Sequence, residues 1–430
     1  MDNTLAKELI SFINDSPSPF HVVKQLEMAL KDRGFTALDL REKWILEKNN
    51  KYYTIINDSA IFAFDIGEGN IEEEGFKIIG SHTDSPGFRI KPAPEIKSNR
   101  YMKLNTESYG GPILYSWLDR PLSLAGRVLL KGDSPFKPEK ILVDFKEPVA
   151  IIPSLAIHMN RNVNQGIEFN KQKDTLPLLG MIKDELEENH KMIRFIADHL
   201  NIDTDKILDF DLFLYPVEKA SLAGIHKEFI SAPKLDDLAM VHAGLKAMMN
   251  TKAKRGINII FCFDNEEVGS SSKEGADSPT ASYILERILL ALGKSREDYF
   301  RALASSFMIS ADMAHAFHPN YEEKQDPTNR PLINGGPVIK LSANKEYASD
   351  GSTTAVFEQI CKEAGVPVQY FVNRSDIKGG TTIGPIMARQ LGISCIDVGN
   401  PILSMHSIRE LGGVLDHKYI INAFEKYYSL

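Results

Sequence analysis

The apolar positions of the first 90 residues change from a helical period to a strand period. Leu5, Leu9 and Phe12 recur at the spacing of one helix face, and a second helix is expected at about residues 22–32. Three apolar runs typical of strands follow, at residues 52–56, 59–65 and 76–81. The last run leads directly into His82, so the beginning of the chain predicts helices followed by a sheet.

Between residues 90 and 155 the pattern changes to short β-rich pieces separated by Gly, Pro and charged turns. The expected strands are residues 101–104, 113–117, 124–130 and 141–145. Only one long helical pattern follows, at residues 181–200. We interpret this part of the chain as a separate β-rich domain.

Alternating helix and strand patterns return near Asp236. Helices are expected at residues 238–249 and 281–292, and strands at residues 257–263, 306–309, 337–341, 367–372 and 395–398. A chain of 430 residues is longer than one ordinary core of about 150 residues requires. We therefore expect one α/β domain formed by residues 1–92 and 231–430, with residues 93–230 inserted as the β-rich domain.

Composition narrows the possible function classes. The formal net charge is −8 and the basic residues are dispersed, so the chain lacks the positive stripe that binds nucleic-acid backbones. No apolar run approaches about 18 residues and no basic leader opens the chain, so neither membrane insertion nor export is expected. Cys262, Cys361 and Cys395 lie in apolar segments without CxxC spacing, which is typical of reduced thiols in a cytoplasmic protein.

Five segments end a strand-like run on a residue that could hold a divalent metal. These residues are His82, Asp236, Glu267, Asp312 and His406. In open α/β sheets ligands bind beyond the carboxyl ends of the strands, so side chains that are distant in sequence can converge there. Carboxylates and imidazoles delivered to one such edge are typical of a two-metal hydrolase.

Two short patterns refine this prediction. His82 and Asp84 are two residues apart, so both lie on one face of an extended segment, where the aspartate can accept the second imidazole N–H. Of the adjacent carboxylates Glu266 and Glu267, one can bind metal while the other deprotonates a water. Taken singly, each pattern has a structural alternative, such as a helix N-cap for Asp236 or an acidic pair at a helix N-terminus.

Three further features leave alternatives open. His315 and His318 follow Asp312 closely, and either could be a ligand or could lie in a solvated loop. The glycine cluster at residues 379–385 is either a tight turn or a cradle of backbone N–H groups for an oxyanion or carboxylate. It has no Lys and no GxGxxG pattern, so phosphate binding is disfavoured.

The chain resembles the M18 family of metalloaminopeptidases, the aspartyl aminopeptidase group, from end to end. The motifs that carry the resemblance are SPSPFH at 16–21, SHTDSPG at 81–87, WLDR at 117–120, AIHMNR at 156–161, DNEEVGS at 264–270, SADMAH at 310–315, GTTIGP at 380–385 and MHSIRE at 405–410. The resemblance implies an α/β, mixed-sheet zinc exopeptidase domain with an inserted β-rich oligomerisation domain. It also implies assembly into a homododecamer built from dimers.

Carried over by position, the resemblance implies two zinc ions per subunit, with Mn²⁺ or Co²⁺ as alternatives. One ion would be held by His82 and Asp312 and the other by Glu267 and His406, with Asp236 bridging them. Glu266 would be the general base, Asp84 would orient His82, and His158 would stabilise the tetrahedral intermediate, reaching it across a subunit boundary. Many relatives have an amide where this chain has Asp237, and the bond between Asp236 and Asp237 is expected to be cis.

The function that these features predict is removal of single N-terminal residues from peptides in the cytoplasm. Lys340 would suit an acidic first residue, although a neutral preference is a second possibility, and Gly380 and Thr381 are further substrate-binding candidates. A carboxypeptidase or amidohydrolase with the same metal pair is the alternative within the larger group of such enzymes. A non-catalytic assembly protein with a vestigial site is the alternative from another class.

Overall fold

The chain forms two compact units in this computed structural model, which describes residues 3–182 and 191–430. Unit 1 comprises Met1–Asp84, Ala220–Met405 and Glu410–Leu430, and unit 2 comprises Ser85–Lys219 and His406–Arg409. Part of the helix expected at 181–200 lies outside the described residues, and its described part is α4 (Lys191–Leu200). Among the described residues, no helix is long and apolar enough to cross a membrane.

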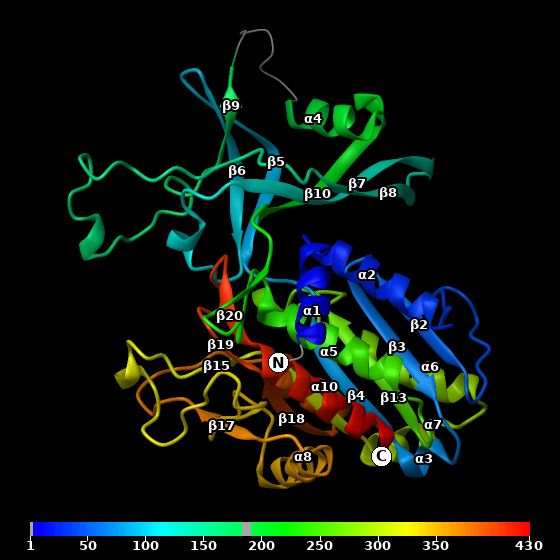
Figure 1. Cartoon of the computed structure of the whole chain (residues 1–430). Coiled ribbons are helices and arrows are strands. Elements are labelled where there is room, and N and C mark those ends of the chain that lie inside the picture. Colours follow the sequence, from blue (N-terminus) through cyan, green and yellow to red (C-terminus); the bar gives the residue numbers. More distant parts are fainter. Residues whose placement is uncertain (1–2, 183–190) are drawn as a thin grey trace. The chain divides into compact units, whose positions relative to one another are not determined.

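Within the described residues, a nine-stranded mixed sheet forms the framework of unit 1 (Figure 1). Its strands, in spatial order, are β1 (Thr36–Ala37), β2 (Lys51–Ile56), β3 (Ala60–Ile66), β13 (Ile257–Phe263), β4 (Phe76–His82), β14 (Phe307–Ala311), β18 (Ser394–Gly399), β16 (Val338–Leu341) and β17 (Gln369–Val372). β13, β4, β14 and β18 are mutually parallel neighbours, whereas β3 and β16 pair antiparallel with the ends of this group. The predicted mixed α/β fold is confirmed.

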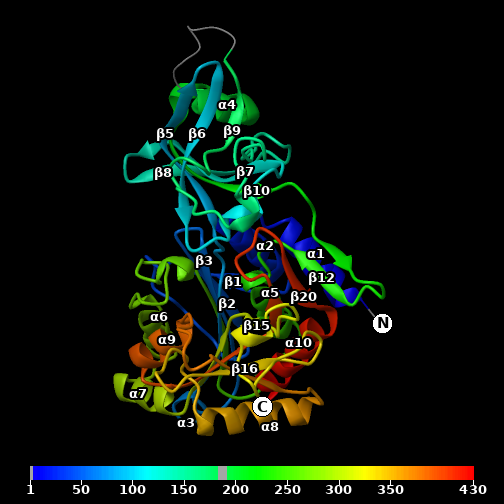
Figure 2. The same cartoon turned by 90° about the vertical axis from the view of Figure 1, so that its left-hand side faces the viewer.

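Helices cover both faces of this sheet because successive strand side chains point to opposite faces. Ile260 and Cys262 of β13 pack with one group of helices, and Phe261 and Phe263 pack with the other. The first group is α1 (Thr4–Asn14), α2 (Pro19–Asp32), α5 (Leu235–Asn250), α8 (Gly351–Ala364) and α10 (Val414–Ser429). The second group is α3 (Ile71–Glu74), α6 (Thr280–Ala291), α7 (Arg296–Ala304) and α9 (Ile383–Leu391). Each group buries one apolar face of the sheet (Figure 2).

Unit 1 has a second, smaller sheet, two of whose strands follow β14 and β18 closely in sequence. Its described strands are β11 (Ser221–Ala223), β12 (Phe229–Ala232), β20 (Glu410–Gly413), β19 (Pro401–Leu403) and β15 (Ala314–His315), in spatial order. β15 begins two residues after Asp312, so the chain that leaves β14 is fixed again at once.

Unit 2 is an antiparallel β structure. In its described residues, six strands pair in the order β8 (Lys137–Asp144), β7 (Leu122–Ser134), β10 (Ile207–Pro216), β5 (Gly87–Ser98), β6 (Tyr101–Tyr109) and β9 (Leu178–Met181). Met192 and Ile196 of α4 pack into the apolar core of this sheet with Phe88, Leu124 and Leu212. The β-rich texture expected from the sequence is therefore present.

Two of the differences from the expected elements have a local cause. α2 begins at Pro19, three residues before the expected start, because the first helical position needs no backbone N–H. Residues 113–117, expected to be a strand, contain instead the 3₁₀ helix η1 (Leu114–Trp117). The backbone N–H and the hydroxyl of Ser116 both donate to Ile113 O, at 3.1 and 2.6 Å, and these bonds close the turn.

Candidate metal centre

Three neighbouring parallel strands end at one edge of the large sheet. His82 is the last residue of β4 and lies opposite Phe263, the last residue of β13. Asp312 directly follows β14, and Glu266 and Glu267 follow β13 in the 3₁₀ helix η5 (Glu266–Val268). Buried apolar strands therefore deliver an imidazole and three carboxylates to the same edge.

Among the described residues of unit 1, the potential ligand atoms form two groups that share His82. In each group, one ligand atom per residue lies within 4.8 Å of the others. The members besides His82 are Asp236, Asp237 and Asp312 in the first group, and Glu266 and Glu267 in the second. His82 Nε2 lies 3.5 Å from Asp236 Oδ1. Side chains of this kind, gathered from distant segments, fit a site for divalent cations.

The electrostatics of these residues also fit a site for divalent cations, because the two groups contain many carboxylates and little positive charge. Burial raises the pKa of Glu266 to about 8 and that of Asp312 to about 6, and nearby carboxylates add to the shift. Burial and the neighbouring charges hold the pKa values of Asp237 and Glu267 well above their usual range. Burial lowers the pKa of His82, yet the surrounding aspartates raise it well above 6.5 overall. Bound cations would allow these carboxyl groups to be ionised together.

Asp84 connects the two strand ends. Its Oδ1 accepts the backbone N–H of Glu266 at 3.2 Å, and its Oδ2 accepts that of Glu267 at 3.1 Å. His82 Nδ1 lies 3.2 Å from Asp84 Oδ1 and 3.1 Å from Asp84 O. The buried carboxylate can therefore hold the Nδ1–H tautomer of His82, which leaves Nε2 available toward Asp236.

The segment that carries Asp236 has an unusual backbone. The peptide bond between Asp236 and Asp237 is cis, which confirms the expectation from the resemblance. The backbone N–H of Asp236 donates to Glu410 Oε2 at 3.0 Å, and the ammonium of Lys234 donates to the carbonyls of Ser16 and Pro17. Contacts from β20 and from the start of the chain thus fix this segment.

Asp237 is a member of the group that the sequence did not assign as a ligand. It is fully buried, and its Oδ2 accepts the backbone N–H of His82 at 3.1 Å. Its Oδ1 accepts no hydrogen bond from the described residues, although a buried carboxylate oxygen needs a partner or a cation. The only sequence signal was its position beside Asp236.

Lys340 of β16 supports the segment after β14. The residue is 2% exposed, and its ammonium donates to Asp312 O at 2.8 Å and Met313 O at 3.0 Å. It also lies 3.7 Å from Asp312 Oδ1, and the charge of Asp312 raises the pKa of Lys340 against the opposing effect of burial. A substrate role for Lys340 stays a prediction beside this structural one.

The remaining candidates belong to other segments of the described chain. His158 is exposed in unit 2, and His406, also in unit 2, has its Nδ1 3.2 Å from Gly111 O. Gly380 and Thr381 are exposed in the loop before α9, where Thr381 Oγ1 donates to Glu346 O at 2.9 Å. Among the described residues, neither His315 nor His318 belongs to a group of potential metal ligands.

Comparison with known proteins places this arrangement in a family. A family model described as aminopeptidase I zinc metalloprotease (M18) matches residues 12–428. A probable M18 family aminopeptidase 2 of Clostridium acetobutylicum is 55% identical over 426 residues, which are 99% of this chain and 98% of the relative.

Solved structures agree with that match. The structure of the Ape4 and Nbr1 complex has a chain that is 36% identical, with a TM-score of 0.95, over 99% of this chain and 85% of the other. The S. cerevisiae mApe1 dodecamer is 30% identical, with a TM-score of 0.87, over 99% and 96% of the two chains. With sequence and fold matched along nearly its whole length, the chain belongs to the M18 family and is a metalloaminopeptidase, a zinc-dependent hydrolase.

Proposed function

We propose that this enzyme removes single N-terminal residues from peptides with two zinc ions per subunit. The observation that carries the proposal is the convergence of buried ligand atoms at His82, Asp236 and Asp312, with Glu267 in the group that shares His82. His82 and Asp312 would hold one ion, Glu267 and His406 the other, and Asp236 would bridge them. When bound, such a pair polarises the scissile carbonyl and acidifies water. Mn²⁺ or Co²⁺ could replace zinc at oxygen and nitrogen ligands.

Glu266 is the proposed general base. It would take the proton of the attacking water and pass it to the leaving amine. Its backbone is held by Asp84, so the carboxylate has a defined position at the strand end. A base must be able to accept a proton near the operating pH, and burial raises the pKa of Glu266 to about 8, which favours proton uptake.

The decisive experiment replaces Glu266 with Gln. The variant keeps the size of the side chain and the backbone bond to Asp84, so zinc content should be unchanged while kcat falls by at least about 100-fold. Glu274→Gln, in the same connection after β13, is the matched control and should retain wild-type turnover. A Glu266→Gln enzyme with full zinc content and unchanged kcat would assign the base to another residue.

His158 is proposed to act through assembly. It lies on the exposed segment of unit 2, and the related mApe1 structure is a dodecamer. We expect this chain to form a homo-oligomer, a dodecamer built from dimers, in which His158 donates to the oxyanion developing in a neighbouring subunit. Such a donor contributes chiefly in the transition state.

Substrate preference and location complete the proposal. Lys340 donates to two carbonyls and lies 3.7 Å from Asp312 Oδ1, and its third donor would reach the carboxylate of an acidic first residue. Gly380 and Thr381 would contact the peptide from the loop before α9. A neutral preference is the alternative, and aspartyl, glutamyl and leucyl p-nitroanilides distinguish the two. Three buried free cysteines favour a cytoplasmic location.

A further inference from the structure

A buried aspartate in β18 joins three separate segments. Asp397 is 0% exposed, and its Oδ1 accepts the hydroxyls of Ser310 at 2.6 Å and Thr382 at 2.5 Å. Its Oδ2 accepts the backbone N–H of Ala348 at 2.6 Å, and its own N–H donates to Ser349 Oγ at 2.9 Å. Both carboxylate oxygens are therefore occupied by donors from other segments.

Two of those segments are loops, and the third is a strand of the sheet. Ser310 lies in β14, two residues before Asp312, and it pairs with Asp397 in the parallel register. Ala348 and Ser349 precede α8, and Thr382 is the N-cap of α9. One carboxylate thus connects both loops to the strand that ends at the candidate metal centre.

The close packing around Asp397 leaves little freedom in this connection. A Cβ at Gly384 would lie 2.4 Å from Asp397 Oδ2, so α9 can approach the carboxylate only because glycine occupies that position. The two loops are also joined to each other, since Thr381 Oγ1 donates to Glu346 O. Displacing one loop would therefore disturb the other.

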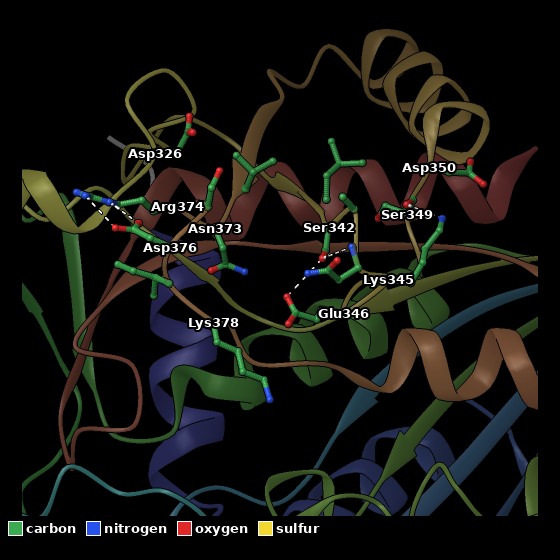
Figure 3. A pocket seen from close by; sticks show the side chains of 16 residues that line it. Asp326, Ser342, Lys345, Glu346, Ser349, Asp350, Asn373, Arg374, Asp376 and Lys378 are labelled. Atoms are coloured by element: carbon green, nitrogen blue, oxygen red, sulfur yellow. Dashed lines mark hydrogen bonds and ion pairs between the residues drawn. The ribbon is translucent and has the colours of Figure 1, made fainter.

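Both loops line one cavity, and the loop before α9 also lines a second. A cavity of about 940 Å³ is lined by residues 341–346, 349 and 350 on one side and residues 372–378 on the other, together with Asp326. Figure 3 shows Lys345 and Glu346 on the first wall and Asn373 and Lys378 on the second. A second cavity of about 470 Å³ is lined by residues 377–380 and by residues that follow Asp312 and β19.

We propose that Asp397 is a positioning residue for peptide binding. It holds the loops before α8 and α9 against β14, so that the cavity walls, with Gly380 and Thr381, keep the spacing that a bound peptide requires. The inference rests on the proposed substrate role of Gly380 and Thr381. Under this proposal, peptide affinity depends on Asp397, whereas zinc binding depends on the residues at the strand ends.

A carboxylate is needed because each of its partners donates. In an Asp397→Asn variant with its amide oxygen toward Ser310 and Thr382, the amide N–H groups would face the backbone N–H of Ala348. With the amide reversed, both hydroxyl protons would lose their buried acceptor. An unsatisfied buried donor is costly, so either orientation should shift a loop. Asp397→Asn also removes a charge close to Asp312 and Lys340, so a neutral change is the cleaner test.

The test compares Thr382→Val with Thr382→Ser in the full-length zinc enzyme. Valine keeps the shape but removes the hydroxyl, whereas serine keeps the hydroxyl. Valine also removes the N-cap of α9, so Ser295→Ala, which removes the N-cap of α7, is the matched control for lost stability. The measurements are kcat and KM for aspartyl and leucyl p-nitroanilides, the inhibition constant of the free amino-acid product, zinc content and the thermal midpoint.

We expect Thr382→Val to raise KM and the product inhibition constant by about five- to tenfold, the factor of one buried hydrogen bond, with kcat within about threefold and full zinc content. Thr382→Ser should restore wild-type KM, and Ser295→Ala should lower the thermal midpoint without changing KM. An unchanged KM in Thr382→Val, or equal KM increases in Thr382→Val and Ser295→Ala, would overturn the inference. Failure of the proposed chemistry would appear separately, as wild-type turnover in Glu266→Gln.

Discussion

Replacing Asp84 with Asn should weaken zinc binding although Asp84 is not a proposed ligand. The carboxylate receives the N–H groups of Glu266 and Glu267 on different oxygens, and His82 Nδ1 lies at hydrogen-bond distance from one of them. An asparagine has a single acceptor oxygen, so at least one N–H would face an amide N–H. A hydrogen bond to a charged group is worth about 1.5–3 kcal/mol. That energy corresponds to a loss in zinc affinity of about 10- to 100-fold, the range seen when the partner of a ligating histidine is removed.

The assay equilibrates wild-type and variant enzymes in chelator-buffered zinc and measures bound zinc and peptidase activity. Asp264→Asn is the matched control, because Asp264 is a buried acid at the same strand end. Burial and the nearby charge of Asp84 raise the pKa of Asp264 to about 7, so near neutral pH much of it is already uncharged, as an amide is. Zinc affinity in Asp264→Asn should stay within about threefold. Wild-type affinity in Asp84→Asn, or equal losses in both variants, would refute the reasoning.

Three further predictions concern assembly, specificity and pH. Mixing His158→Ala subunits with Glu266→Gln subunits should restore activity in hybrid sites, and verified mixed oligomers no more active than either parent would contradict a shared site. Lys340→Met should lower kcat/KM for an aspartyl substrate by about 10- to 100-fold more than for a leucyl substrate. Equal losses for both substrates would mean that Lys340 only supports Asp312 and does not contact the substrate. Between about pH 7.5 and pH 5, His417 should cost the wild-type enzyme about 2 kcal/mol of its unfolding free energy, and His417→Gln should remove this cost. The reason is that burial holds the pKa of His417 at about 3, whereas an unfolded histidine titrates near 6.5, and parallel pH profiles would exclude this role.

The strand ends could be predicted because local patterns determine them. An apolar run followed within a few residues by His82, Glu267 or Asp312 indicates a buried strand and a polar edge, and the parallel pairing of β4, β13 and β14 brings those edges together. The nearly continuous apolar run at residues 257–263 likewise indicates a strand buried on both faces of the sheet. Such features require only short stretches of sequence and general rules of sheet geometry.

Features that depend on distant pairing could not be predicted in this way. Asp397 is a single aspartate within a strand, and nothing near it in sequence indicates that Ser310, Ala348 and Thr382 all donate to it. The 3₁₀ turn at Leu114–Trp117 was expected to be a strand, because its apolar content resembles one while the bonds of Ser116 that close the turn depend on local geometry. Long-range contacts and hydroxyl hydrogen bonds leave no periodic signal.

The place of β13 in the large sheet has a consequence for synthesis of the chain. β13 lies between β3 and β4, yet it follows β4 by roughly 175 residues, which take about 10–35 s to translate at about 5–20 residues per second. During that time β3 and β4 lack the strand that lies between them, while residues 85–219 of unit 2 are translated. Unit 2 can therefore fold first, and the nascent first segment of unit 1 is the part that chaperones must shield from aggregation.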